Sequence, residues 1–74
     1  MTQLEAVRDV THQGSWWTLA ELKAEMNIRL GVYASEAGIS ARLRDLRKQG
    51  MIVDRQLVKG HKGLYEYRVT EPKR

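Results

Sequence analysis

Basic side chains are concentrated in one part of this 74-residue chain. Residues 42–62 carry seven of them against two acidic residues, a net charge of +5, whereas residues 1–41 have a net charge of −2. A local positive field of this kind attracts polyanions. The seven basic residues are Arg42, Arg44, Arg47, Lys48, Arg55, Lys59 and Lys62. Their concentration therefore points to binding of an acidic partner.

Other kinds of chemistry have little support in the sequence. The chain has no cysteine, and its two histidines, His12 and His61, lie far apart without carboxylates at metal-ligand spacing. No nucleophile with its base, phosphate-binding loop or pair of carboxylates is recognisable. We therefore expect a protein that is not an enzyme and that uses no metal, cofactor or small-molecule substrate.

The size and composition predict one small domain over residues 1–74, with residues 71–74 as a flexible tail. A core of this size supplies only about 3–5 kcal/mol of net stability, which leaves little room for a deep pocket. The lack of cysteine is typical of the reducing cytosol. No apolar run approaches the roughly 20 residues that a membrane span needs, and the N-terminus has no signal-peptide pattern. We expect a cytoplasmic protein with no membrane contact.

Two capping boxes, in which a threonine is followed three residues later by a glutamate, predict helix starts at Thr2 and Thr18. The first helix is expected to end at His12 or Gln13, before Gly14. The second is expected to cover residues 18–26.

Between these helices, residues 15–17 predict a short extended segment that places one tryptophan in the core and the other outward. Residues 27–34 interrupt the helical period and contain Gly31, so they are expected to form a turn. The apolar residues of that turn that are expected to pack inward are Ile28, Leu30, Val32 and Tyr33.

A third helix is predicted over residues 35–49, with Ser35 as its cap and Gly50 after its end. Its inward stripe is Ile39, Leu43 and Leu46. At about 100° per residue, the opposite side carries Ala37, Ala41, Arg44 and Lys48, with Ser40 and Arg47 on one flank and Arg42 on the other.

Residues 51–59 and 64–70 predict two β-strands, because apolar and aromatic residues alternate with polar ones. In the second strand, Tyr65, Tyr67 and Val69 are expected to face the core. Residues 60–63, Gly-His-Lys-Gly, predict a hairpin tip. The expected fold class is therefore α+β, with three helices and a small antiparallel sheet.

This order of elements resembles the winged helix-turn-helix domain. Residues 40–48, SARLRDLRK, are similar to the S-A-R-[I/L]-x-[D/E]-L-R-K stretch of small helix-turn-helix proteins of phages and prophages. The resemblance implies a supporting helix over 18–26, a recognition helix over 35–49 and a wing tip over 59–63. One departure is the turn over 27–34, which has eight residues where a tight helix-turn-helix uses about 3–4.

The resemblance implies a sequence-specific double-stranded DNA-binding protein, a small transcriptional regulator of phage or prophage type. If the third helix enters the major groove, Arg44 is the best candidate for a base contact, because a guanidinium can bond guanine bidentately. Small residues such as Gly38 would let the backbone approach. The expected base contacts are Ser35, Glu36, Ala37, Ser40, Ala41 and Arg44. The expected backbone contacts are Arg42, Arg47, Lys48, Arg55, Lys59, His61 and Lys62.

Three other interpretations stay open. A charge-rich helical face is often only a solvated face, and Asp45 is expected to neutralise Arg42 or Arg44. The domain could instead be a protein-interaction module, with the edge at Trp16 and Trp17 or the second helix as the partner interface. RNA binding would require the two tyrosines of the last strand to be exposed as a stacking platform.

The DNA-binding interpretation also allows a homodimer. One helix contacts few base pairs, and a two-fold site bound by two copies doubles that number.

Overall fold

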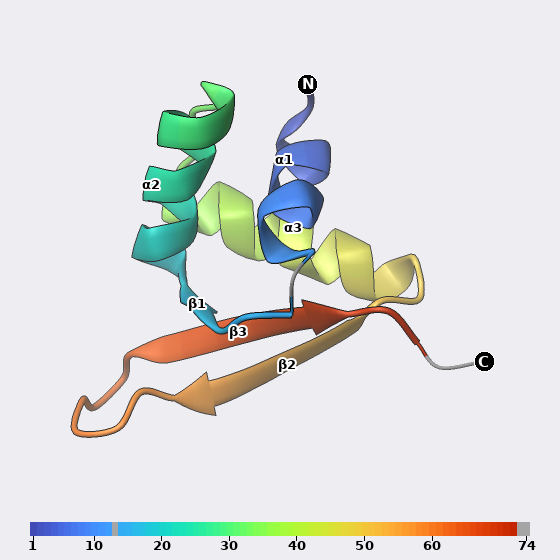
Figure 1. Cartoon of the computed structure of the whole chain (residues 1–74). Helices are drawn as coiled ribbons and strands as arrows, with labels where there is room; N and C mark the ends of the chain where they lie inside the picture. Colours follow the sequence, from blue (N-terminus) through green and yellow to red (C-terminus); the bar gives the residue numbers. More distant parts are fainter. Residues whose placement is uncertain (13, 73–74) are drawn as a thin grey trace.

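The computed structural model describes residues 1–12 and 14–72. Three helices lie over one face of a three-stranded antiparallel sheet (Figure 1), which confirms the α+β class. The elements are α1 (Gln3–Thr11), β1 (Trp17–Thr18), α2 (Leu19–Leu30), α3 (Glu36–Lys48), β2 (Ile52–Leu57) and β3 (Tyr65–Thr70). Gln13, one of the two expected ends of the first helix, and part of the expected tail over 71–74 lie outside the described residues.

Both predicted capping boxes are present. The Thr2 hydroxyl accepts a hydrogen bond from the Glu5 backbone N–H at 3.1 Å, and the Glu5 carboxylate accepts one from the Thr2 N–H at 3.0 Å. Thr18 and Glu21 make the same reciprocal pair at 3.1 and 2.8 Å. These bonds satisfy N–H groups that a helix start leaves free. The hydrogen bonds from Thr2, backbone first and then side chain, lower the pKa of Glu5.

The expected interruption over residues 27–34 is wrong in its extent. α2 continues to Leu30 and ends at Gly31, whose φ of 64° is left-handed and whose N–H donates to Asn27 O. The connection to α3 is therefore residues 31–35. Ile28 does not fit the apolar pattern of the helix, because its side chain points to solvent and is 79 % exposed. Tyr33 is 76 % exposed, so the expectation that these two residues pack inward is also wrong.

The sheet has the order β1-β3-β2 and separates two kinds of side chain. Val53 pairs with Val69, and Trp17 pairs with Tyr67, and these four side chains contribute to the helix-covered side. On the other face, Arg68 forms an ion pair with Asp54 at 3.2 Å. The guanidinium of Arg68 also lies 4.6 Å from the ring centre of Trp16. The predicted split of the two tryptophans is therefore confirmed.

The core joins all three helices to β3. Ile39, Leu43 and Leu46 are buried, which confirms the predicted inward stripe of the third helix. The other buried apolar residues are Ala6, Val7, Val10, Leu22, Met26 and Val69. Among the helices of the described residues, none is long and apolar enough to cross a lipid bilayer. This packing holds one side of α3 against the rest of the domain and leaves the opposite side exposed to solvent.

Candidate nucleic-acid interface

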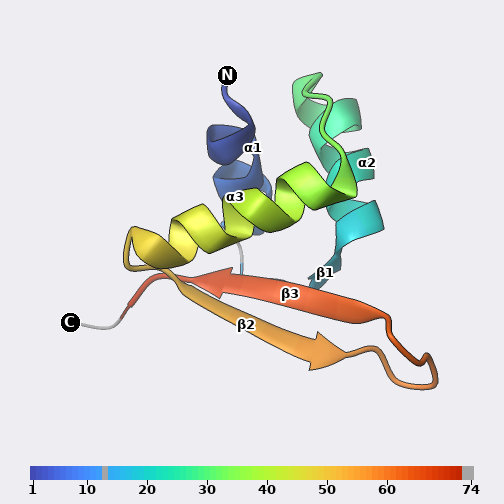
Figure 2. The ribbon, with the colours of Figure 1, turned by 180° about the vertical axis from the view of Figure 1, so that it is seen from behind.

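α3 is bounded by local hydrogen bonds at both ends. The Ser35 hydroxyl accepts a bond from the Gly38 N–H at 3.0 Å, as predicted for a cap. At the other end Gly50 has a φ of 97°, and the next N–H, that of Met51, donates to Leu46 O at 3.1 Å. This tight exit sends β2 back beside the helix. In Figure 2 the hairpin of β2 and β3 passes below α3, and its tip extends beyond the first turn of the helix.

The side of α3 that faces away from the core carries most of the expected base contacts. Ala37, Arg44 and Lys48 are exposed, and Ala41 is half-buried. At the helix start, Ser35 and Glu36 are exposed, and Ser40 is half-buried farther along.

Gly38 does not belong to this outward face. A Cβ at this position would lie 3.2 Å from Ser35 Oγ and 3.5 Å from Gln3 Oε1. Gly38 therefore faces the start of α1, and its expected role in letting the backbone approach bases is wrong. Gln3 also donates from Nε2 to Tyr33 O at 3.3 Å, so this contact region joins α1 to the connection before α3.

Arg42 is the basic residue of α3 whose charge is neutralised locally. Its Nε lies 2.9 Å from Asp45 Oδ2, one helical turn away, as expected for Asp45. Helical geometry places Arg42 on the flank opposite Ser40 and Arg47. The exposed positive charge of α3 therefore comes mainly from its other basic residues.

A groove of about 370 Å³ lies between α3 and β2. Three arginines line it, and none of its described lining residues is acidic. Its lining residues are Ser40, Leu43, Arg44, Arg47, Val53, Arg55 and Tyr67. The sequence predicted Ser40 and Arg47 on a common flank of the helix, but it gave no sign that β2 would bring Arg55 to them.

Two of the three arginines in this groove are held by neighbouring groups. Arg47 donates from Nη2 to Val53 O at 2.9 Å, which ties α3 to β2. The guanidinium of Arg55 lies 4.5 Å from the ring centre of Tyr65, within cation–π range. Arg44 takes part in none of the ion pairs found among the described residues.

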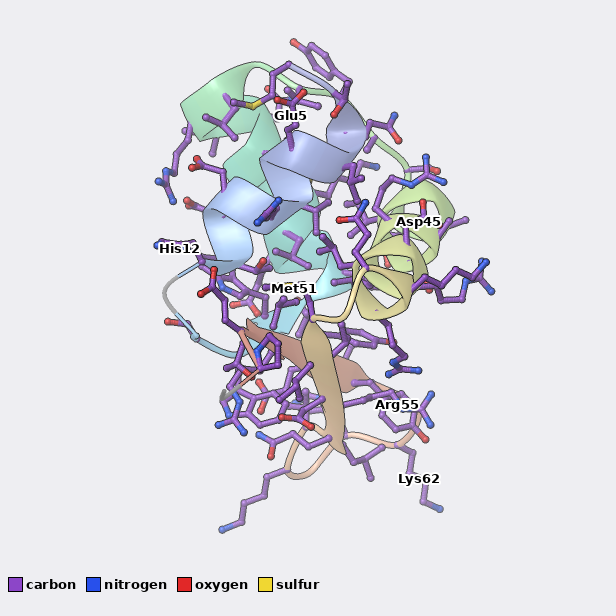
Figure 3. The ribbon with its side chains drawn as sticks, turned by 90° about the vertical axis from the view of Figure 1, so that its right-hand side faces the viewer. Glu5, His12, Asp45, Met51, Arg55 and Lys62 are labelled. Carbon is purple, nitrogen blue, oxygen red and sulfur yellow. The ribbon has the colours of Figure 1, made fainter. Side chains whose placement is uncertain are left out.

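The hairpin tip supplies the remaining expected backbone contacts. Lys59, His61 and Lys62 are all exposed. The N–H of Val58 donates to Leu64 O at 2.8 Å, and this bond closes the turn. Figure 3 shows Arg55 and Lys62 on the same side of the molecule as α3.

The tyrosines and tryptophans do not form the surfaces that the alternatives need. Tyr67 packs against the core as predicted, whereas Tyr65 is 36 % exposed, so the expectation that it faces the core is wrong. Tyr65 lines a hollow with Leu19 of α2 and Glu36 of α3, and Arg55 covers part of its ring. Trp17 packs against the core, and Trp16 is half-buried.

The most exposed large apolar residues of α2 and its connection are instead Ile28 and Tyr33, which sequence reasoning placed inside. Ala20, Ala24 and Ile28 are spaced four residues apart and therefore share one helix face. That face points away from buried Leu22 and Met26, so extension of the helical period through residue 30 would have identified it.

We found no family model, curated protein or solved structure that matches this chain. Function is therefore inferred from the placement of the chain's own residues. The placement that bears on it most directly is that of Arg55 and Lys62, which lie on the same side of the molecule as α3 (Figure 3), and of Arg44 and Arg47, which line one groove with Arg55.

Proposed function

We propose that this chain is a sequence-specific double-stranded DNA-binding protein of the winged helix-turn-helix type. In this proposal α3 enters the major groove as the recognition helix and the hairpin tip over 59–63 touches the DNA backbone as the wing. The biological role is that of a small transcriptional regulator of phage or prophage type, in keeping with the likeness of residues 40–48.

The observation that carries the proposal is that Arg55 and Lys62 of the hairpin lie on the same side of the molecule as α3 (Figure 3), and that Arg55 lines one groove with arginines of α3. The acidic residues nearest to it in sequence, Asp45 and Asp54, are paired with Arg42 and Arg68. Six cations of α3 and the hairpin take part in none of the ion pairs found among the described residues. They are Arg44, Arg47, Lys48, Arg55, Lys59 and Lys62. A surface of this kind suits the phosphates of a duplex.

The helical geometry also supports this pose. The connection over residues 31–35 is close to the 3–4 residues of a tight helix-turn-helix. The sequence predicted a turn of eight residues, so the chain departs less from that motif than expected. An α-helix fits the major groove of B-DNA. The outward residues of α3 would contact base edges, while phosphate contacts fix the register. The proposed base contacts are Ser35, Glu36, Ala37, Ser40, Ala41 and Arg44.

Salt dependence tests the proposal directly. If the six cations neutralise about five or six phosphates, log K falls against log[salt] with a slope near −5. Fluorescence anisotropy on a labelled duplex at several salt concentrations measures this slope. In vitro site selection with the purified chain then identifies a preferred sequence. A chain that binds no duplex at low salt would contradict the proposal.

A protein-interaction module is the second candidate, and one observation favours it. Ile28 is 79 % exposed on a face of α2 that it shares with exposed Ala20 and Ala24. This candidate predicts a co-purifying partner that is lost in Ile28→Ser, together with no duplex binding at low salt. RNA binding has weaker support, because only Tyr65 of the two expected platform residues reaches the surface.

A further inference from the structure

We propose that the groove between α3 and β2 is a binding site for a single phosphodiester group, held by Arg47 from the helix and Arg55 from the strand. The inference rests on the proposed DNA binding and deepens it, because it names the place where one backbone phosphate is fixed.

The charge inside the groove is the first argument. Arg44, Arg47 and Arg55 line it together, and no carboxylate is among its described lining residues. Asp54 precedes Arg55, but successive residues of a strand point to opposite faces, and Asp54 pairs with Arg68 on the far side of the sheet. Three like charges that converge without a counter-charge repel one another. A bound anion removes that repulsion.

The arginines are also partly ordered before any ligand arrives. Arg47 uses one N–H for Val53 O, and Arg55 stacks over Tyr65. A guanidinium has five N–H donors, so each retains several for a ligand. Because two arginine side chains are already restrained, less side-chain entropy is lost when they bind.

The chemistry of the walls favours phosphate over a simple carboxylate. Two guanidinium groups on opposite walls present two donor forks, which match the two non-bridging oxygens of a phosphodiester. The apolar side chains of Leu43, Val53 and Tyr67 line the same groove, so water screens the charges less than on an open surface. The groove has a volume of about 370 Å³, so it has room for more than one water molecule.

A phosphate held here has a consequence for the rest of α3. Ser40 and Arg44 line the same groove and lie next to the outward face of the helix. The hydroxyl of Ser40 is a further donor within that lining. The site therefore sets the position of one DNA strand relative to the residues proposed to contact its bases.

The first test uses inorganic phosphate on the full chain. Phosphate is titrated at constant ionic strength, with chloride as the replaced anion, and the arginine Nε–Hε signals are followed by NMR. The expected result is a saturable shift of Arg47 and Arg55 while Arg8 and Arg29 stay unchanged. Equal shifts of all arginines, or no shift in the groove, overturn the proposal.

Matched variants provide the second test. Arg55→Gln and Arg8→Gln each remove the charge of one exposed arginine, but only Arg55 lines the groove. Arg47 is left intact because its bond to Val53 also holds β2. We expect Arg55→Gln to weaken phosphate binding about fivefold or more, since it loses charge-assisted hydrogen bonds. Arg8→Gln is expected to change it less than twofold. Equal losses overturn the proposal.

Binding of a random duplex by the same two variants distinguishes failure of the phosphate site from failure of the proposed DNA binding. Duplex binding that Arg55→Gln weakens more than Arg8→Gln supports both. Duplex binding that the two variants weaken equally overturns the phosphodiester site and leaves DNA binding intact. Phosphate binding in the groove without duplex binding overturns DNA as the ligand and identifies a free phosphorylated molecule as the source of the phosphate.

Discussion

Arg42 and Arg44 lie two residues apart on α3 and have different surroundings. Arg42 is paired with Asp45 at 2.9 Å, whereas Arg44 is exposed and lines the groove beside β2. We predict that Arg44→Ala costs about 1–3 kcal/mol of binding to a selected duplex and relaxes the preference at one base pair. Arg42→Ala is the matched control and is expected to cost less, because its charge is already neutralised. Anisotropy on the selected duplex and on single-base variants measures both. Equal losses of Arg44→Ala on selected and random duplexes would remove it as a base contact.

Lys62 is exposed at the hairpin tip and lies on the side of α3 (Figure 3). We predict that Lys62→Gln weakens binding to all sequences alike and reduces the salt slope by about 1, because it loses one phosphate contact. The control is Arg29→Gln, which removes the same charge from α2, where Arg29 pairs with Glu25 at 3.6 Å. A slope that both variants change equally would show that net charge, rather than position, determines binding.

At the residue scale, sequence reasoning succeeded where a side chain's direction follows from its own helix. The inward leucines of α3 and the opposite flanks of Ser40 and Arg42 follow from the turn per residue. It failed for Gly38, because the start of α1 occupies the space beside that residue. The contacts Arg47–Val53 and Arg55–Tyr65 were also missed, because they depend on how the hairpin packs rather than on local spacing.

The start of α1 gives a prediction about pH. The hydrogen bonds from Thr2 lower the pKa of Glu5 in the folded chain. Stability from this cap is therefore fully present above the ordinary glutamate pKa of about 4.3 and is lost as the pH falls through the lower folded value. Chemical denaturation at several pH values should show this loss in the native chain and a weaker one in Glu5→Gln. An identical pH dependence in both would contradict the assignment.

At the scale of elements, five of the six helices and strands have close to their predicted bounds. Capping boxes fixed the starts of α1 and α2, and glycine marked the end of α3 and the hairpin tip. The end of α2 was missed because three consecutive exposed residues, Asn27, Ile28 and Arg29, separate buried Met26 from Leu30, which continues the helical period and packs against the core. The helix ends at Gly31, which has a left-handed φ.

At the scale of the whole molecule, the small core leaves little reserve of stability. Leu46 is fully buried, and Leu46→Ala is expected to cost about 2–5 kcal/mol. A core of this size supplies about 3–5 kcal/mol in total, so the variant should be largely unfolded near physiological temperature. Leu57→Ala removes the same atoms from a side chain that is 53 % exposed and should have a small effect. Thermal denaturation followed by circular dichroism compares them, and equal shifts in Tm would contradict this account.

The arrangement that unites α3 with the hairpin could not be read from composition. The sequence predicted that both would be basic, but their common side depends on the turn at Gly50 and on the return of β2 beside the helix. Figure 2 shows this return, in which β2 starts beside the end of α3 and the hairpin then diverges from the helix toward its tip. Arg44, Arg47 and Arg55 line one groove only through that geometry.

The bond between Arg47 and Val53 has a consequence for how copies of the chain behave together. β2 lies at the edge of the described sheet, and alternation from Val58, which bonds Leu64, points the Val53 carbonyl toward that edge. An exposed edge strand can form hydrogen bonds with a strand of another molecule. Because the Arg47 guanidinium already donates to that carbonyl, a strand of another copy has less access to it, and the positive charge there opposes the approach of a second Arg47.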